Sequence, residues 1–124
     1  MCIRDRFRGT YVPDQPSGRY VGGYYFEIKY VSGGKVGLQK LRTSGDTAGY
    51  WSDPIRIGAP RYDIQPGQWY VLTVEVRGDH ILCFIDDELV FDVHDSDWTH
   101  GTVGFWGYQM NDARFDEALV EPLT

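Results

Sequence analysis

Short stretches in which apolar and polar residues alternate constrain this chain more than any other feature. The clearest stretch is residues 69–77, which alternates strictly over its second half and has Tyr70, Leu72, Val74 and Val76 on one face. Successive side chains of a β-strand point to opposite faces, so this stretch predicts a strand with one apolar face. Helical periodicity is nearly absent, because Gly or Pro interrupts the windows that would carry it. The chain is therefore expected to be all-β.

Turn dipeptides divide the chain into strands. Gly33-Gly34 predicts a hairpin turn, and Gly78-Asp79 and Asp86-Asp87 predict the two turns of a three-stranded meander. Strands are predicted over residues 7–12, 24–31, 35–41, 69–77, 80–86, 88–93, 102–108 and 114–121, with a short edge strand over 55–57 in the irregular segment 42–67. Many short strands at this spacing are typical of a β-sandwich or barrel.

Composition argues against several classes of partner. The chain has 12 Lys and Arg against 18 Asp and Glu, a net charge of −6. A nucleic-acid binder needs a basic surface to displace counterions from phosphates, and an anionic membrane attracts basic segments, so neither partner is expected. Cys83 lies in an apolar run, which predicts a small buried hydrophobe and not a catalytic or metal-bound thiol.

Short motifs from residue 67 onward occur in a characteristic order. They are a Gly-x-Trp-Tyr entry, a Gly turn, an Asp turn, a Gly-x-Val-Gly-aromatic strand and a closing Phe-Asp-x-x-x-Val. The residues are Gly67, Trp69, Tyr70, Gly78, Asp86, Gly101, Val103, Gly104, Phe105, Phe115, Asp116 and Val120. This order resembles the C-terminal half of concanavalin-A-like (laminin-G-like) sandwiches of the lectin–glucanase superfamily, close to the 3-keto-disaccharide hydrolase type. The resemblance covers residues 7–122 and implies an antiparallel β-sandwich of the jelly-roll type.

The chain departs from that family at its start and in one turn. Residues 1–6 resemble a sequencing-adapter remnant of metagenomic assemblies, and a genuine charged N-terminal arm is the alternative. We therefore expect residues 1–6 to be non-native and residues 7–124 to be a partial domain that lacks its first strands. The strand over 114–121 would then be a bare edge with exposed apolar residues such as Leu119 and Val120. In the middle of the chain, the family's Asp-Gly turn is Asp86-Asp87.

No catalytic constellation can be identified. The Glu-x-Asp-x-x-Glu motif of related glucanases is absent, as are a Gly-x-Ser-x-Gly elbow and a His-Glu-x-x-His motif. All three histidines are expected to be exposed to solvent, His80 beside a turn and His94 and His100 in the loop before residues 102–108. Three aspartates come closest to a metal site: Asp92, Asp95 and Asp97. We expect them to serve turns, with a Ca²⁺ site as the alternative, and we expect no other cofactor.

Aromatic and polar residues of the predicted strands suit a sugar ligand, because flat rings stack on sugar faces and polar groups bond the hydroxyls. In residues 102–108, Val103 and Phe105 are predicted to face the core. Strand parity then puts four residues on one concave face as ligand-binding candidates: Arg8, Gln39, Trp106 and Tyr108. Trp51, in the long loop, is a further candidate, as a ligand platform or a plug. Alternatively, the two aromatics of the sheet only cover it against the loop 42–67 or another domain.

The resemblance and the residues together favour a non-catalytic carbohydrate-binding or accessory module. Its expected partners are a polysaccharide or oligosaccharide and the other domains of a larger polysaccharide-processing protein. One alternative is a glycoside-hydrolase-type enzymatic domain that acts on 3-keto-glycosides. Another is a structural or adhesive laminin-G-like module. The resemblance implies an extracellular or periplasmic location.

Overall fold

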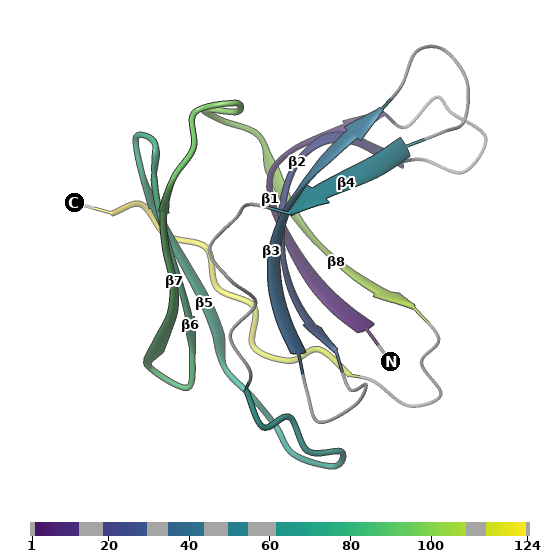
Figure 1. Cartoon of the computed structure of the whole chain (residues 1–124), viewed down its shortest axis with the longest axis vertical. Helices are drawn as coiled ribbons and strands as arrows, with labels where there is room; N and C mark the ends of the chain where they lie inside the picture. Colours follow the sequence, from purple (N-terminus) through teal and green to yellow (C-terminus); the bar gives the residue numbers. More distant parts are fainter. Residues whose placement is uncertain are drawn as a thin grey trace.

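The computed structural model describes residues 2–12, 19–29, 35–43, 50–54, 62–108 and 114–123, and it contains two layers of antiparallel strands (Figure 1). The strands are β1 (Cys2–Val12), β2 (Arg19–Lys29), β3 (Lys35–Thr43), β4 (Tyr50–Pro54), β5 (Leu72–Arg77), β6 (His80–Ile85), β7 (Glu88–His94) and β8 (Thr102–Tyr108). One sheet has the order β4-β3-β2-β1-β8 and the other β5-β6-β7. These described residues form no helix that could span a membrane. The predicted all-β antiparallel sandwich is confirmed.

Strand β1, which lies between β2 and β8, starts earlier than predicted. It pairs with β2 on one side and with β8 on the other from Cys2 onward, whereas a start at Phe7 was expected. Ile3 and Phe7 are directed to the inside of the sandwich, whereas Arg6, at a position of the opposite parity, is not part of the core, which continues the pattern of a strand. Residues 2–6 therefore contribute a full segment of sheet.

The predicted meander forms as expected. Strands β5, β6 and β7 pair in sequence, with Val74 opposite Cys83 and Cys83 opposite Phe91. The turn between β6 and β7 has left-handed backbone at both Asp86 (φ 48°) and Asp87 (φ 67°). The hairpin of β2 and β3 also forms as predicted, although its turn at 30–34 falls outside the described residues.

The core lies between the two sheets. Its buried side chains come from β1, β2, β3, β6, β7 and the segment before β5: Phe7, Tyr24, Phe26, Ile28, Val36, Leu38, Ile64, Ile81, Cys83, Ile85, Phe91 and Val93. Phe26 and Phe91 join the sheets in an edge-to-face contact with ring centroids 6.0 Å apart. Cys83 is fully buried, as predicted. Tyr70, Leu72, Val74 and Val76 pack against this core, which confirms the predicted inner face of β5.

The sequence predictions fail at the β8 edge of the five-stranded sheet. Val103 and Phe105 were expected in the core but are 49% and 50% exposed. Strand β8 is the edge of the five-stranded sheet, the opposite sheet has three described strands, and the buried cluster includes no residue of β8. Residues 114–121 form no strand. Instead Phe115 stacks on Phe105 with ring centroids 4.8 Å apart. Leu119 and Val120, in the same segment, are exposed as predicted.

The long irregular segment holds a strand in a different place from the prediction. Residues 55–57 lie outside the described residues, whereas β4 at Tyr50–Pro54 pairs with β3 as the edge of the sheet. A proline at the end of an edge strand is compatible with pairing because no neighbour needs its missing N–H.

Candidate ligand-binding face

Polar side chains lie in register on the outer face of the five-stranded sheet, the face that points away from the three-stranded sheet. Arg6 in β1 is opposite Tyr25 in β2, and Tyr25 is opposite Gln39 in β3. Glu27 follows Tyr25 at the next position of the same parity. Since Phe26 between them points into the core, alternation directs these side chains outward. We call Arg6, Tyr25, Glu27 and Gln39 the outer-face cluster.

Most of the outer-face cluster is removed from solvent. Tyr25 is 0%, Glu27 1% and Arg6 8% exposed, whereas Gln39 is partly exposed. The Tyr25 hydroxyl donates to Gln39 Oε1 at 2.6 Å, so the amide group of Gln39 presents its NH₂ as a donor. A Cβ on Gly37 would lie 3.5 Å from Gln39 Nε2 and 3.8 Å from Glu27 Oε1, so both groups border the space above this glycine. The result is a set of donors and acceptors in fixed positions.

Gln39 is a predicted ligand-binding residue and belongs to this cluster, but Arg8 does not. Arg8 has positive φ (49°) at a register shift in β1, and such a bulge resets the alternation of side chains. Its guanidinium donates to the carbonyl oxygens of Gly78 at 2.7 Å and Trp98 at 3.1 Å. The predicted shared face is therefore wrong for Arg8, which fastens the β5–β6 turn instead.

The three predicted aromatic candidates are described only through their backbone. Trp106 is opposite Arg4, which is opposite Glu27 of the outer-face cluster. Tyr108 ends β8, and Trp51 lies in β4. Their side chains lie outside the described part of the structure, so their predicted role as ligand platforms stays a prediction.

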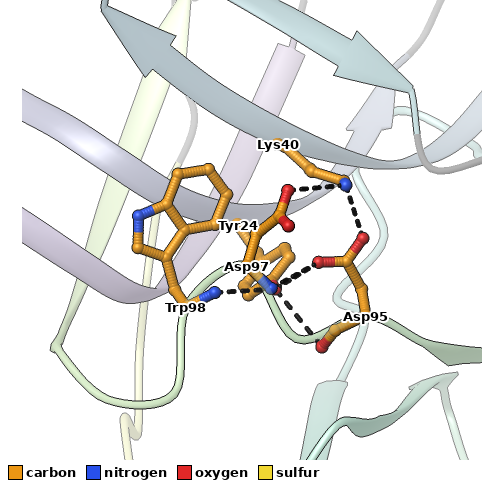
Figure 2. A network of polar contacts seen from close by, with 5 residues as sticks. All are labelled: Tyr24, Lys40, Asp95, Asp97 and Trp98. Atoms are coloured by element: carbon orange, nitrogen blue, oxygen red, sulfur yellow. Dashed lines mark hydrogen bonds and ion pairs between the residues drawn. The ribbon is translucent and has the colours of Figure 1, made fainter.

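A second group of polar residues ties the inner side of the sheet to the connection between β7 and β8 (Figure 2). The Tyr24 hydroxyl donates to Asp95 Oδ1 at 2.6 Å and accepts from the Trp98 amide at 3.2 Å. The Lys40 ammonium lies 2.5 Å from Asp95 Oδ2 and 2.8 Å from Asp97 Oδ2. Because these groups bond one another, the network is suited to holding the connection in place.

Ionisation in this network follows from its contacts. Burial, and then the hydrogen bond to Asp95, raises the pKa of Tyr24 to about 12. Burial alone would raise the pKa of Asp95, but hydrogen bonds from Lys40 and Tyr24 outweigh it and the pKa is lowered. Hydrogen bonds to Asp95 and Asp97 raise the pKa of Lys40. The lowered pKa of Asp95 and the raised pKa of Lys40 keep this pair charged at neutral pH.

The structure does not bring the three candidate calcium ligands together. Lys40 occupies the position between Asp95 and Asp97 that a cation would take. Asp92 instead lies in β7, where its Oδ1 is 2.6 Å from His80 Nε2. His80 begins β6 directly after a turn, as predicted, whereas His94 ends β7, so the prediction that His94 is a loop residue is wrong.

A hollow of about 450 Å³ lies beside the β6–β7 turn. Its lining is aromatic and polar: Tyr62, Asp63, Gln65, Gln68, Tyr70, Asp86 and Glu88. The rings of Tyr62 and Tyr70 meet edge to face with centroids 6.4 Å apart. The Tyr70 hydroxyl accepts a hydrogen bond from the backbone N–H of Gln65 at 2.7 Å. This is a second surface with ring and polar groups for a ligand.

Three members of the outer-face cluster were not predicted as site residues. Arg6 fell within the stretch expected to be non-native, and Glu27 was expected on the polar face but not as a buried group. Tyr25 carried a signal, since a large ring between Tyr24 and Phe26 occupies a position that alternation assigns to the polar face.

Comparisons with known proteins agree with this architecture. A family model described as a 3-keto-alpha-glucoside-1,2-lyase-like domain matches residues 3–120. Among solved structures, the carbohydrate-binding module CBM66 from Bacillus subtilis is similar, with a TM-score of 0.62 and 24% sequence identity over 84% of this chain and 55% of that one. The chain thus spans about half the length of that structure, and the likeness shows the fold. No curated protein matches the chain.

Proposed function

The chain belongs to the 3-keto-alpha-glucoside-1,2-lyase-like domain family, and we propose that it is a non-catalytic carbohydrate-binding or accessory module of a larger polysaccharide-processing protein. The observation that carries the proposal is the outer-face cluster, which holds a guanidinium, a phenol, a carboxylate and an amide on one sheet face. Sugar hydroxyls donate and accept hydrogen bonds, so their recognition needs such a mixed set in fixed positions. The name of the CBM66 module supports the same class of ligand.

Within the proposed site, Gln39 makes the direct contact. It is partly exposed, and Tyr25 fixes its side chain through the 2.6 Å hydrogen bond. Trp106 is proposed to supply the stacking ring, because its backbone lies in the same row of the sheet as Glu27. A buried tyrosine that orients the contacting amide lowers the ordering cost of binding.

Glycan-array screening followed by calorimetry on the best glycan tests this proposal. Gln39→Ala is expected to weaken binding roughly tenfold, the effect of about 1.4 kcal/mol in lost hydrogen bonds. Gln65→Ala is the matched control, since it makes the same change in the hollow beside the β6–β7 turn. If only Gln65→Ala weakens binding, the hollow is the sugar site and the outer face is not. If no glycan binds, the module is not a carbohydrate-binding one.

The family description favours one other function, the cleavage of 3-keto-glucosides. A ketone at C3 acidifies the proton on C2. A base can remove that proton while the C1–O bond breaks and the leaving alkoxide takes up a proton. Glu27 is a carboxylate that is only 1% exposed, and it would be the base on this face. Incubation with a 3-keto-glucoside tests this alternative. Release of the leaving group that is abolished by Glu27→Gln would establish a catalytic domain. If no leaving group is released, the enzymatic alternative is excluded.

The location follows from the proposed ligand. We propose an extracellular or periplasmic module, because large polysaccharides do not cross membranes. Secretion assays on the parent protein check this point, and purely cytoplasmic material would contradict it.

A further inference from the structure

Two histidines and an aspartate gather on the outer face of the three-stranded sheet. His80 is opposite His94 in the pairing of β6 with β7, and Asp92 precedes His94 by two residues on the same face of β7. Their neighbours Ile81 and Val93 point into the core, so the three polar side chains point away from it. The exposed fractions of the side chains are 36% for His80, 54% for Asp92 and 63% for His94, so an ion in solution can reach all three.

The three side chains already have much of the geometry of a metal site. The imidazole rings of His80 and His94 are parallel within 7° and their centroids are 4.4 Å apart. One ligand atom from each of His80, Asp92 and His94 lies within 4.8 Å of the others. Ligand atoms around a tetrahedral zinc ion are about 3.3 Å apart, as follows from metal–ligand distances of about 2.0–2.1 Å. Rotation of the side chains is needed to close the difference.

We propose that His80, Asp92 and His94 bind a divalent transition-metal ion, with zinc as the best match. Two imidazole nitrogens and one carboxylate oxygen suit zinc and its neighbours, whereas calcium takes six to eight oxygen ligands. Three protein ligands leave a fourth position for water or for a group of a partner molecule. Among the described residues, no other group of histidine, cysteine and acidic side chains has this geometry.

The surroundings of the three ligands support the same assignment. Asp79 Oδ1 lies 3.1 Å from His94 Nδ1, and a carboxylate on the second ring nitrogen is the usual outer partner of a metal-bound imidazole. With Asp79 accepting the Nδ1 proton, the lone pair for the ion is on Nε2. On the neighbouring strand β5, Arg77 is opposite His80. Asp79 and Asp92 together outweigh that single positive charge and favour a cation.

Calorimetric titration of the metal-free, untagged chain with Zn²⁺ tests the proposal, with Ca²⁺ as the comparison ion. One Zn²⁺ per chain is expected to bind, and Ca²⁺ is not. His80→Ala and His94→Ala should each weaken Zn²⁺ binding more than tenfold, and Asp79→Asn, which removes the outer partner, about tenfold. His100→Ala is the matched control, because it removes the remaining histidine from the β7–β8 connection, and it should leave the affinity within twofold.

The proposal is overturned if Zn²⁺ does not bind, or if His100→Ala weakens binding as much as His80→Ala does. Nitrogen-detected NMR of the histidine rings in the unaltered chain gives a second test that does not depend on how the variants fold. Zn²⁺ should shift the ring nitrogens of His80 and His94 and leave those of His100 in place. Shifts confined to His100 would contradict the site. None of these outcomes depends on whether the module binds sugar.

Discussion

The β6–β7 turn places two aspartates in left-handed backbone, Asp86 with φ 48° and Asp87 with φ 67°. This conformation brings a β-carbon close to backbone atoms, and glycine adopts it without that cost. Asp86 has a compensating role, because its Oδ1 accepts from the Val71 amide at 2.8 Å. No hydrogen bond of the Asp87 side chain offsets its strain among the contacts described for this turn.

Asp87→Gly is therefore expected to raise the free energy of unfolding by about 0.5–1 kcal/mol. Asp86→Gly relieves similar strain but removes the acceptor for Val71, so its gain should be smaller or negative. Urea unfolding monitored by tryptophan fluorescence measures both variants. Equal or lower stability for Asp87→Gly would show that the turn does not store this strain.

Asp5 carries a charge on the inner face of the sandwich. It is opposite Phe26 in β2 and opposite Phe105 in β8, and burial raises the pKa of its carboxyl group from 3.8 to about 6. The folded state thus binds this proton more tightly than the unfolded state does. The stabilisation that comes from this tighter proton binding is fully present below pH 3.8 and is lost as the pH rises through 6.

Asp5→Asn should accordingly raise the free energy of unfolding at pH 7 by about 1–3 kcal/mol, since a shift of about two pKa units corresponds to at most about 3 kcal/mol. The same variant should lose the decline in stability between pH 4 and 6. Thermal unfolding across that range measures the effect, with the surface change Asp116→Asn as control. If both variants show the same pH profile, burial of Asp5 is not what shapes it.

Side-chain burial could be predicted from the sequence where alternation runs undisturbed, as at Cys83 and along β5. It could not be predicted at Arg8, because a bulge there changes the face to which the side chain points. The sequence does not indicate this bulge, since its left-handed residue is an arginine and not a glycine. The burial of Glu27 could not be predicted for another reason. A polar residue at an outward-facing strand position is expected to be exposed to solvent, and only the folded structure shows that solvent is excluded from this position.

At the scale of elements, the bulge in β1 is packed between two glycines. A Cβ on Gly101 would lie 2.4 Å from the carbonyl carbon of Arg8, and one on Gly23 would lie 2.6 Å from the Cα of Gly9. Both approaches are to backbone atoms, which cannot rotate away. The two glycines therefore let β2 and the start of β8 lie directly against the bulge.

Gly101→Ala is expected to destabilise the fold by roughly 2–4 kcal/mol, since strained backbone adds to a clash that only main-chain movement can relieve. Gly78→Ala is the matched control. It has positive φ (60°) but no atom within 4 Å of the added carbon, so it should cost only about 1 kcal/mol. Chemical denaturation measures the free energy of unfolding of both variants. An equal decrease in the two variants would mean that the close approach of Gly101 to the bulge does not affect stability.

Elements were predictable where a turn signal separates two alternating runs, as in the β2–β3 hairpin and the β5–β7 meander. The end of the chain shows the limit of that approach. Residues 114–121 alternate well enough to predict a strand, but a strand also needs a neighbour with free backbone groups, and the segment forms no ladder in the structure. The candidate site could be predicted only in part. The alternation of side chains identified Gln39. Its cross-strand partners Tyr25 and Arg6 could not be identified, because the register between strands is defined only by their pairing in the folded chain.

For the molecule as a whole, burial is concentrated in one part of the sandwich. The buried side chains gather between β1–β3 and β6–β7, whereas the apolar residues of β8 and of the C-terminal segment stay open to solvent. The exposed apolar residues there are Val103, Phe105, Phe115, Leu119, Val120 and Leu123. Exposed apolar groups in such number on neighbouring segments mark a surface that associates with something.

We predict that the isolated chain self-associates through the C-terminal segment, with sedimentation that depends on concentration and strengthens toward the isoelectric point of about 4.9. Leu119 is 77% exposed, so a lysine there costs little folding free energy but places a charge in the contact. Leu119→Lys should weaken association by about tenfold, because excluding one large apolar side chain from water is worth roughly 1.5–3 kcal/mol. Leu89→Lys makes the same change in charge at a residue of β7 that is 49% exposed, and it should have little effect. A chain that stays monomeric in the ultracentrifuge, or equal effects of the two lysines, would show that the open segment is not an association surface.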